Sequence, residues 1–127
     1  MMKRLIIWLI ALCASLSMMS QVAYRQYNKY LDRDEFFDRS RTRIGYAKYD
    51  KYLGRTVYYD NSGNIVKYEK EDPYLHRIDI TDKNYNRIGY KKWDKYLERW
   101  EVYDKNGKMT MYYKWDKYLD RWEYHEY

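Results

Sequence analysis

Residues 90–104 read YKKWDKYLERWEVYD, and this segment decides the fold because it recurs along the chain. The related segments are YRQYNKYLDRDEFFD from residue 24, YAKYDKYLGRTVYYD from residue 46, YEKEDPYLHRIDITD from residue 68 and YYKWDKYLDRWEYHE from residue 112. The leading Tyr returns every 22 residues without an insertion, so the chain is one small unit repeated five times. Function is therefore expected on a repeated surface rather than in a single catalytic pocket.

The first 20 residues differ from the repeats in composition. Lys3 and Arg4 precede the apolar run 5–19, and Ser20 precedes the charged, Tyr-rich remainder. A basic start, a short apolar stretch and a small residue at its end are typical of a cleaved secretory signal peptide. A membrane anchor is the alternative, but a spanning helix needs roughly 20 apolar residues. We therefore predict a signal peptide over 1–20, a repeat domain over 21–127 without a transmembrane segment, and export to the periplasm, the outer surface or the medium.

Cleavage would change the composition of the chain in two ways. It would remove Cys13, the one cysteine, and with it disulfides, cysteine-ligated metals and a cysteine nucleophile. It would also take Lys3 and Arg4 from the 25 basic residues, which leaves 23 against 19 acidic ones and a net charge of +4. So mild and mixed a charge does not call for a nucleic-acid partner. All 19 tyrosines remain, so burial must come from aromatic bodies with polar tips that reach water.

Two turns punctuate each unit when it is numbered from its leading Tyr as position 1. The first begins at position 5, as in Asp50-Lys51-Tyr52-Leu53-Gly54, and the second follows position 15, as in the segment DKNGK over 104–108. Asp and Asn bond back to the backbone in turns, and Gly accepts a positive φ. The short runs between the turns are rich in Tyr, Trp, Val and Ile and are typical of strands. We predict an all-β fold in which five tandem hairpins form an elongated antiparallel meander or β-solenoid-like array. The units begin at Tyr24, Tyr46, Tyr68, Tyr90 and Tyr112.

Side-chain chemistry suggests a register in which position 4 faces position 10 and position 2 faces position 12. It places Lys91 opposite Glu101 and Trp93 opposite Arg99, both favourable cross-strand pairs. Strand alternation then assigns positions 1, 11, 13 and 21 to the core and positions 2, 4, 10, 12 and 14 to the opposite face. That second face would be a ladder of aromatic rings flanked by arginines. The candidate ligand-binding residues are Tyr27, Tyr49, Trp93, Trp115, Arg33, Arg55, Arg99 and Arg121.

Both groups of candidates have a structural alternative. The arginines either pair with turn carboxylates such as Asp50 and lie on a ring, or bind anionic groups of a polymer. The rings either pack between units or form a platform for sugars or partner chains. A catalytic site, a metal site and a cofactor are not expected, because His76 and His125 are the only histidines and the carboxylates recur at turns in every copy.

The fourth unit resembles the cell-wall-binding, choline-binding-type repeat. The likeness rests on Gly89-Tyr90, followed by the aromatic run from Trp100 and by Asn106-Gly107-Lys108-Met109. The Tyr-Asp pairs are also similar to YD-type and MORN-type hairpin repeats. The resemblance implies a hairpin solenoid that binds wall polymers through aromatic cages between units. The opening Trp of the family is Tyr here, so no site residue is carried over.

Two functional hypotheses follow. The first is an exported, non-enzymatic envelope protein that binds a glycan, a cell-wall polymer or a protein partner through the aromatic and arginine ladder. The second is a structural or assembly role, either as a subunit of an envelope complex or as self-associating β-rich material, because short Tyr-rich strands with open edges can stack chain on chain. Dense charged residues oppose that stacking.

Overall fold

The structure, a computed structural model, describes residues 21–127, and the predicted signal peptide over 1–20 lies outside the described residues. Within 21–127 the chain forms ten strands and no helix. The strands are β1 (Tyr24–Asn28), β2 (Arg33–Phe37), β3 (Arg43–Asp50), β4 (Arg55–Asp60), β5 (Ile65–Asp72), β6 (Arg77–Asp82), β7 (Arg87–Asp94), β8 (Arg99–Asp104), β9 (Met109–Asp116) and β10 (Arg121–Glu126). The prediction of an antiparallel all-β fold built from hairpins is confirmed.

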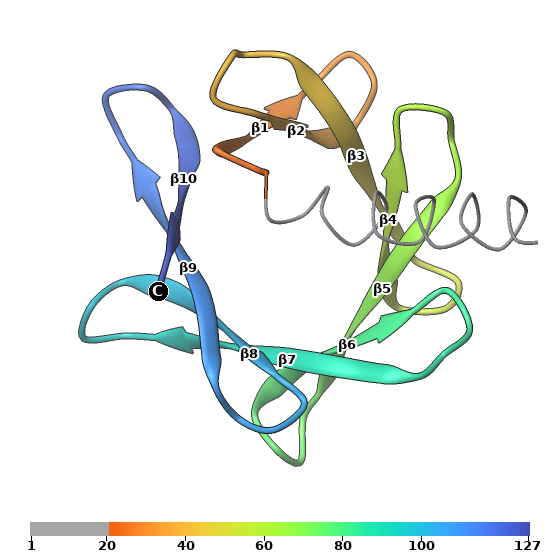
Figure 1. Ribbon diagram of the computed structural model, residues 1–127. Helices are drawn as coiled ribbons and strands as arrows, with labels where there is room; N and C mark the ends of the chain where they lie inside the picture. Colours follow the sequence, from red (N-terminus) through yellow and green to blue (C-terminus); the bar gives the residue numbers. More distant parts are fainter. Residues whose placement is uncertain (1–20) are drawn as a thin grey trace, which may run out of the picture.

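The ten strands close into a barrel, so the prediction of an open meander or solenoid-like array is wrong. Each strand pairs with its neighbours in sequence, and β1 pairs with β10 to complete the ring. Figure 1 is a view down the axis of this ring, and it shows the hairpins arranged around a common centre. Closure gives every strand two hydrogen-bonded neighbours and removes the open edges that a flat array would expose.

The predicted register is wrong by one residue. Position 4 faces position 11, not position 10, as in the pairs Tyr49 with Thr56 and Trp93 with Trp100. A shift of one residue exchanges the faces of a strand. Positions 2, 4, 11 and 13 therefore share the inner face of the barrel, and positions 1, 3, 10, 12 and 14 share the outer face. Positions 11 and 13 keep their predicted place on the core side, whereas position 1 does not.

The turns within the hairpins, called tip turns here, all lie at one end of the barrel. They span residues 29–32, 51–54, 73–76, 95–98 and 117–120. The Asp or Asn at position 5 caps each of them: Asp94 Oδ1 accepts both the Tyr96 and the Leu97 backbone N–H at 3.0 Å. Position 9 has a positive φ in all five copies, although only Gly54 is a glycine there. The Asx cap explains why position 5 is Asp or Asn in every unit.

The turns between hairpins, called base turns, lie at the other end, over residues 38–42, 61–64, 83–86 and 105–108. Each opens with an Asp whose Oδ1 accepts two backbone N–H groups, as Asp104 does from Asn106 and Lys108. The strand pairing shifts register by one residue, as at a β-bulge, beside each base turn, for example between Val102 and Tyr103 where β8 pairs with β9. Bulges bend and twist a strand, and here they occur at the rim of the barrel, where they are common.

A cation–π contact on the outer face fastens each hairpin to the next. The arginine at position 10 lies over the ring of the Tyr at position 1 of the following unit. The distances from guanidinium carbon to ring centroid are 4.1 Å for Arg33 to Tyr46, 4.0 Å for Arg55 to Tyr68, 4.6 Å for Arg77 to Tyr90, 4.2 Å for Arg99 to Tyr112 and 3.8 Å for Arg121 to Tyr24. The last pair joins the ends of the chain, so the same contact that links the repeats also closes the barrel.

Four of these arginines also form an ion pair with the acid at position 12 of their own strand. The pairs are Arg33 with Glu35, Arg77 with Asp79, Arg99 with Glu101 and Arg121 with Glu123. The second unit has Val57 at this position, and the Nε atom of Arg55 is buried without a hydrogen-bond partner. Position 12 thus orients the guanidinium over the next ring, and the second unit lacks this support.

Val57→Glu should stabilise the protein, because the new carboxylate would accept a hydrogen bond from Arg55, as position 12 does in the other four units. A charge-assisted hydrogen bond is worth about 1.5–3 kcal/mol, and the buried Val side chain that is lost offsets much of this gain. We expect a net increase of about 0.5–1 kcal/mol in the free energy of unfolding by urea. Val57→Gln is the matched neutral control, and an equal or greater stability of the Gln variant would contradict this role of position 12.

The seam between β1 and β10 is the shortest interface of the barrel. Its ladder contains two residue pairs, Tyr24 with Glu123 and Arg25 with Trp122, whereas β9 and β10 pair over six. The Tyr124 backbone N–H adds one hydrogen bond to the carbonyl oxygen of Ala23 at 2.9 Å. The contact of Arg121 with Tyr24 therefore carries a larger share of its interface than the equivalent contact elsewhere.

Arg121→Met should loosen the seam selectively. Losing one cation–π contact costs about 1–2 kcal/mol, and at the seam few backbone hydrogen bonds remain to hold the strands. Amide hydrogen exchange should speed up in β1 and β10 while β5 and β6 stay protected. Arg99→Met breaks the same contact at the longer β8–β9 interface and is the control; an equal loss of protection in both variants would contradict the weak seam.

Candidate functional site

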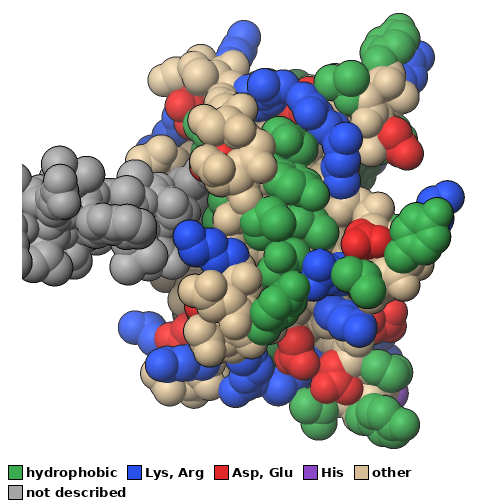
Figure 2. Space-filling model, turned by 90° about the vertical axis from the view of Figure 1, so that its right-hand side faces the viewer, with side chains coloured by type: hydrophobic (Ala, Val, Ile, Leu, Met, Phe, Trp, Pro, Cys, Tyr) green, Lys and Arg blue, Asp and Glu red, His purple; other side chains and the backbone are tan. Residues whose placement is uncertain are grey.

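The tip end of the barrel carries an exposed Tyr-Leu pair in every unit. The tyrosines at position 7 are 86–96% exposed and the leucines at position 8 are about half exposed. The five pairs are Tyr30-Leu31, Tyr52-Leu53, Tyr74-Leu75, Tyr96-Leu97 and Tyr118-Leu119. Figure 2 shows hydrophobic knobs with basic groups beside them, standing apart from one another at this end of the molecule. We call these ten residues the tip ring.

Position 7 is unusual among the constant positions of the repeat. Position 1 forms the hairpin junctions, position 5 caps the tip turns and position 10 supplies the arginine that lies over the next ring. The tyrosines at position 7 contact little of the folded chain beyond a neighbouring lysine. In the fourth unit, Lys95 Nζ lies 5.3 Å from the centroid of the Tyr96 ring. Their exposed apolar surface makes the tyrosines at position 7 candidates for contact with a partner.

The predicted aromatic candidates lie on the inner side of the sheet at the same end. Tyr27, Tyr49, Trp93 and Trp115 remain partly exposed at the rim, and Tyr27 donates a hydrogen bond to Asp32 Oδ1. Trp93 packs edge-on against Trp100 with centroids 5.5 Å apart, and Trp115 packs edge-on against Trp122 at 5.4 Å. The rings of β7–β10 thus form a continuous tryptophan cluster, held by its own edge-to-face contacts.

The predicted arginine candidates lie on the opposite side of the sheet from these rings. Arg33, Arg55, Arg99 and Arg121 occupy the outer face, each over the tyrosine that begins the next unit. The mixed ladder is therefore split by the one-residue error in register. Its rings belong to the rim at the tip end, and its arginines belong to the hairpin junctions.

The interior holds a network of hydrogen-bonded polar residues that the sequence did not predict. Glu69 is at its centre: Oε1 accepts hydrogen bonds from the Tyr58 hydroxyl at 2.8 Å and pairs with Lys91 Nζ at 2.7 Å, and Oε2 accepts one from Lys67 Nζ at 3.3 Å. Lys91 Nζ also donates to the Tyr113 hydroxyl at 2.7 Å. The network extends beyond Tyr58 to Arg25, whose guanidinium donates a hydrogen bond to the Tyr58 hydroxyl at 3.1 Å and forms an ion pair with Asp34.

Burial and neighbouring charge set the protonation of this network. Burial alone would raise the pKa of Glu69, but the charges of Lys91, Lys67 and Arg25 outweigh it and hold the pKa well below its usual range. Burial lowers the pKa of Lys67 against the opposing effect of Glu69. Glu69 is therefore ionised, and it is the anion that the two interior lysines share.

A sequence pattern points to the interior network. Position 2 reads Arg25, Ala47, Glu69, Lys91 and Tyr113, so it differs in every copy, while position 10 is Arg in all five. Identical cations cannot share one closed interior, but complementary residues can. A position whose charge varies along an otherwise regular repeat therefore indicates a polar interior. The tip tyrosines are identical in all five copies, but the sequence places them only within turns.

Comparison of the chain with protein-family models, with curated proteins and with solved structures found no match. Among the described residues, no helix is long and apolar enough to cross a membrane. Within 21–127, no three His, Cys, Asp or Glu side chains gather in a way that could hold a metal ion.

The buried tyrosines predict a steep loss of stability in alkali. Burial raises the pKa of Tyr58, Tyr113 and Tyr124 above the ordinary value of about 10. A raised folded-state pKa gives stability that is complete below the unfolded-state value and is lost as the pH rises above it. Above pH 10 the three groups together should lower the free energy of unfolding by about 4 kcal/mol per pH unit.

Urea unfolding at several pH values, followed by far-UV circular dichroism and phenolate absorbance, measures this slope. Tyr124→Phe keeps the hydrogen bonds of Glu69 and should lower the slope by about 1.4 kcal/mol per pH unit. Tyr127→Phe alters an exposed tyrosine and is the control. A slope that Tyr124→Phe leaves unchanged would contradict the burial of its hydroxyl.

Proposed function

We propose that the protein is an exported, non-enzymatic envelope protein that binds a repetitive glycan or cell-wall polymer at the tip end of its barrel. The observation that carries this proposal is the tip ring: five identical tyrosines, 86–96% exposed, at a constant position with little part in the fold. A tyrosine ring offers an apolar face for stacking and a hydroxyl for hydrogen bonding at a low cost in conformational entropy.

The repetition of the tip ring favours a ligand that is itself repetitive. Five equal contact groups at one end of a rigid scaffold gain affinity through multivalency when the ligand presents equal groups in series. The partly exposed rim rings Trp93 and Trp115 lie at the same end and would add stacking surface beside the tips. The arginines over the outer tyrosines have a structural place and are left out of this site.

The test compares retention of the purified protein on insoluble peptidoglycan and on insoluble cellulose. Replacing all five tip tyrosines by Ser should reduce retention at least tenfold, and replacing two should give an intermediate loss, because each lost contact lowers the avidity. Trp93→Ala with Trp115→Ala tests the rim separately. Tyr127→Ser removes an exposed tyrosine outside the tip ring and is the control. Undiminished retention of the five-fold variant, with its circular dichroism spectrum intact, would refute the tip ring as the binding surface.

An assembly role is the second candidate, and the leucines of the tip ring favour it. Each is about half exposed beside a fully presented tyrosine, so five small apolar patches face away from the barrel. Two barrels, or a barrel and an envelope protein, would bury these patches on contact. Stacking through open strand edges has no such support, since each described strand already has two partners. Concentration-dependent sedimentation that disappears when the five leucines become Ser would favour assembly, whereas a monomer at all concentrations favours the polymer-binding role.

A further inference from the structure

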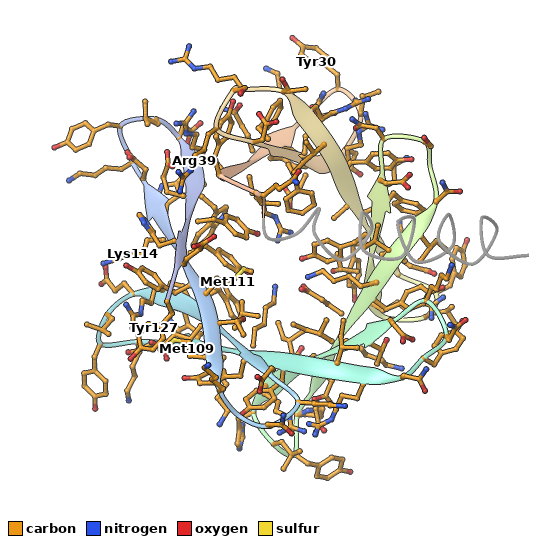
Figure 3. All side chains as sticks on the ribbon, in the orientation of Figure 1. Tyr30, Arg39, Met109, Met111, Lys114 and Tyr127 are labelled. Carbon is orange, nitrogen blue, oxygen red and sulfur yellow. The ribbon has the colours of Figure 1, made fainter. Side chains whose placement is uncertain are left out.

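A cavity of about 220 Å³ lies inside the barrel near the base turns, away from the tip ring. Its apolar wall is formed by Val66, Ile80, Ile88, Val102 and Met111. Figure 3 shows Met111 directed towards the inside of the barrel, whereas Tyr30 and Lys114 point away from it.

The space depends on a difference between the repeats. Position 22 is Gly45, Lys67, Gly89 and Met111 in the first four units, and Gly89 lines the cavity between Lys67 and Met111. A Cβ atom on Gly89 would lie 2.3 Å from the backbone oxygen of Tyr103, so a side chain does not fit there. The close approach of β7 to β8 therefore keeps this part of the interior unfilled.

The polar end of the cavity carries a cation with one long ion pair and one cation–π contact, because Lys67 Nζ lies 3.3 Å from Glu69 Oε2 and 4.2 Å from the Tyr58 ring centroid. Lys67 has a side chain that is 12% exposed and lines the cavity, and its ammonium donates a hydrogen bond of 3.3 Å to Glu69. Glu69 is already engaged by Lys91 at 2.7 Å and by Tyr58 at 2.8 Å. An ammonium group has three donors, so Lys67 has capacity for a further acceptor on the cavity side. The interior network as a whole pairs three cations, Arg25, Lys67 and Lys91, with two carboxylates, Asp34 and Glu69.

Two further carboxylates line the cavity, but their position restricts where an anion can sit. Asp82 and Asp104 open the base turns, and each Oδ1 accepts two backbone N–H groups there. Their negative charge favours a ligand whose anionic group points inwards to Lys67 and whose uncharged part lies along the apolar wall. The lowered pKa of Lys67, caused first by burial, is consistent with a cation that lacks a full counter-charge.

We propose that this cavity binds a small amphipathic anion, a compact apolar body with one carboxylate, through an ion pair between that carboxylate and Lys67. The volume limits the ligand. It lies below the roughly 300–1,000 Å³ of sites for drug-sized molecules. At about 30 Å³ for a water-sized group, the cavity has room for about seven such groups. An aromatic or short-chain monocarboxylate has this size. The site is independent of the tip ring and of any polymer bound there.

Benzoate and its uncharged analogue benzamide are the probes, followed by the NMR shifts of the Met111 and Ile80 methyl groups. Benzoate should shift both signals saturably, and benzamide should bind about tenfold more weakly or less, because it lacks the charge that pairs with Lys67. Lys67→Met should weaken benzoate binding to the level of benzamide. Lys92→Met changes an exposed lysine on the outer face of β7 and should leave the affinity unchanged.

A second variant keeps the proposal testable if Lys67→Met fails to fold. Val102→Phe places a larger side chain in the cavity, so it should abolish the benzoate shifts while Lys67 stays in place. Equal affinity for benzoate and benzamide, or benzoate binding that survives Lys67→Met, would overturn the assignment of the ion pair. Shifts that never saturate would mean that the cavity holds water only.

Discussion

The contact between the arginine at position 10 and the tyrosine at position 1 of the next unit is the interaction on which the rest of the structure depends. A hairpin of two short strands is at best marginally stable alone, so each unit needs its neighbours. The arginine lies over the next ring, the acid at position 12 orients it in four units, and the same tyrosine stacks on position 14 of its own hairpin, as Tyr46 does on Tyr59. Because Arg121 repeats the contact on Tyr24, five copies close into a ring.

Closure explains why the repeats agree outside the barrel and differ within it. An open solenoid stacks equal units, so its interior positions can stay equal. In a closed barrel, residues from all the units meet in one interior, and five arginines there would repel one another. Position 2 accordingly provides a cation at Arg25 and Lys91, an anion at Glu69 and a small residue at Ala47. The divergent inner residues make an asymmetric polar network and a single cavity, while the constant outer residues make a regular ring of junctions and tips.

Sequence reasoning could reach the hairpins but not their register or closure. The Asx caps at Asp50 and Asp94 and the positive φ of Gly63 and Gly107 are local features, so the turns were predictable. The register depends on how many residues the tip turn absorbs, and pairing Trp93 with Arg99 was chemically as reasonable as the observed pairing with Trp100. Residues at positions 4 and 10 were thus joined in one predicted site, although they lie on opposite faces. Closure rests on the contact of Arg121 with Tyr24, 97 residues apart in the chain, which no local pattern reveals.

The two faces of the sheet also differ in what an identical residue in all five repeats can indicate about ligand binding. On the outer face, a constant residue is accounted for by the junction that it forms, so constancy there says little about a ligand. In the interior, five copies of the same charged side chain would repel one another. A binding site there is therefore expected to contain residues that occur in one repeat only, as Lys67 does at position 22. The tip ring is subject to neither constraint: its tyrosines form no junction and share no core, yet they are identical in five copies. The proposed binding of a repetitive ligand would account for that identity, because each tyrosine would then make the same contact.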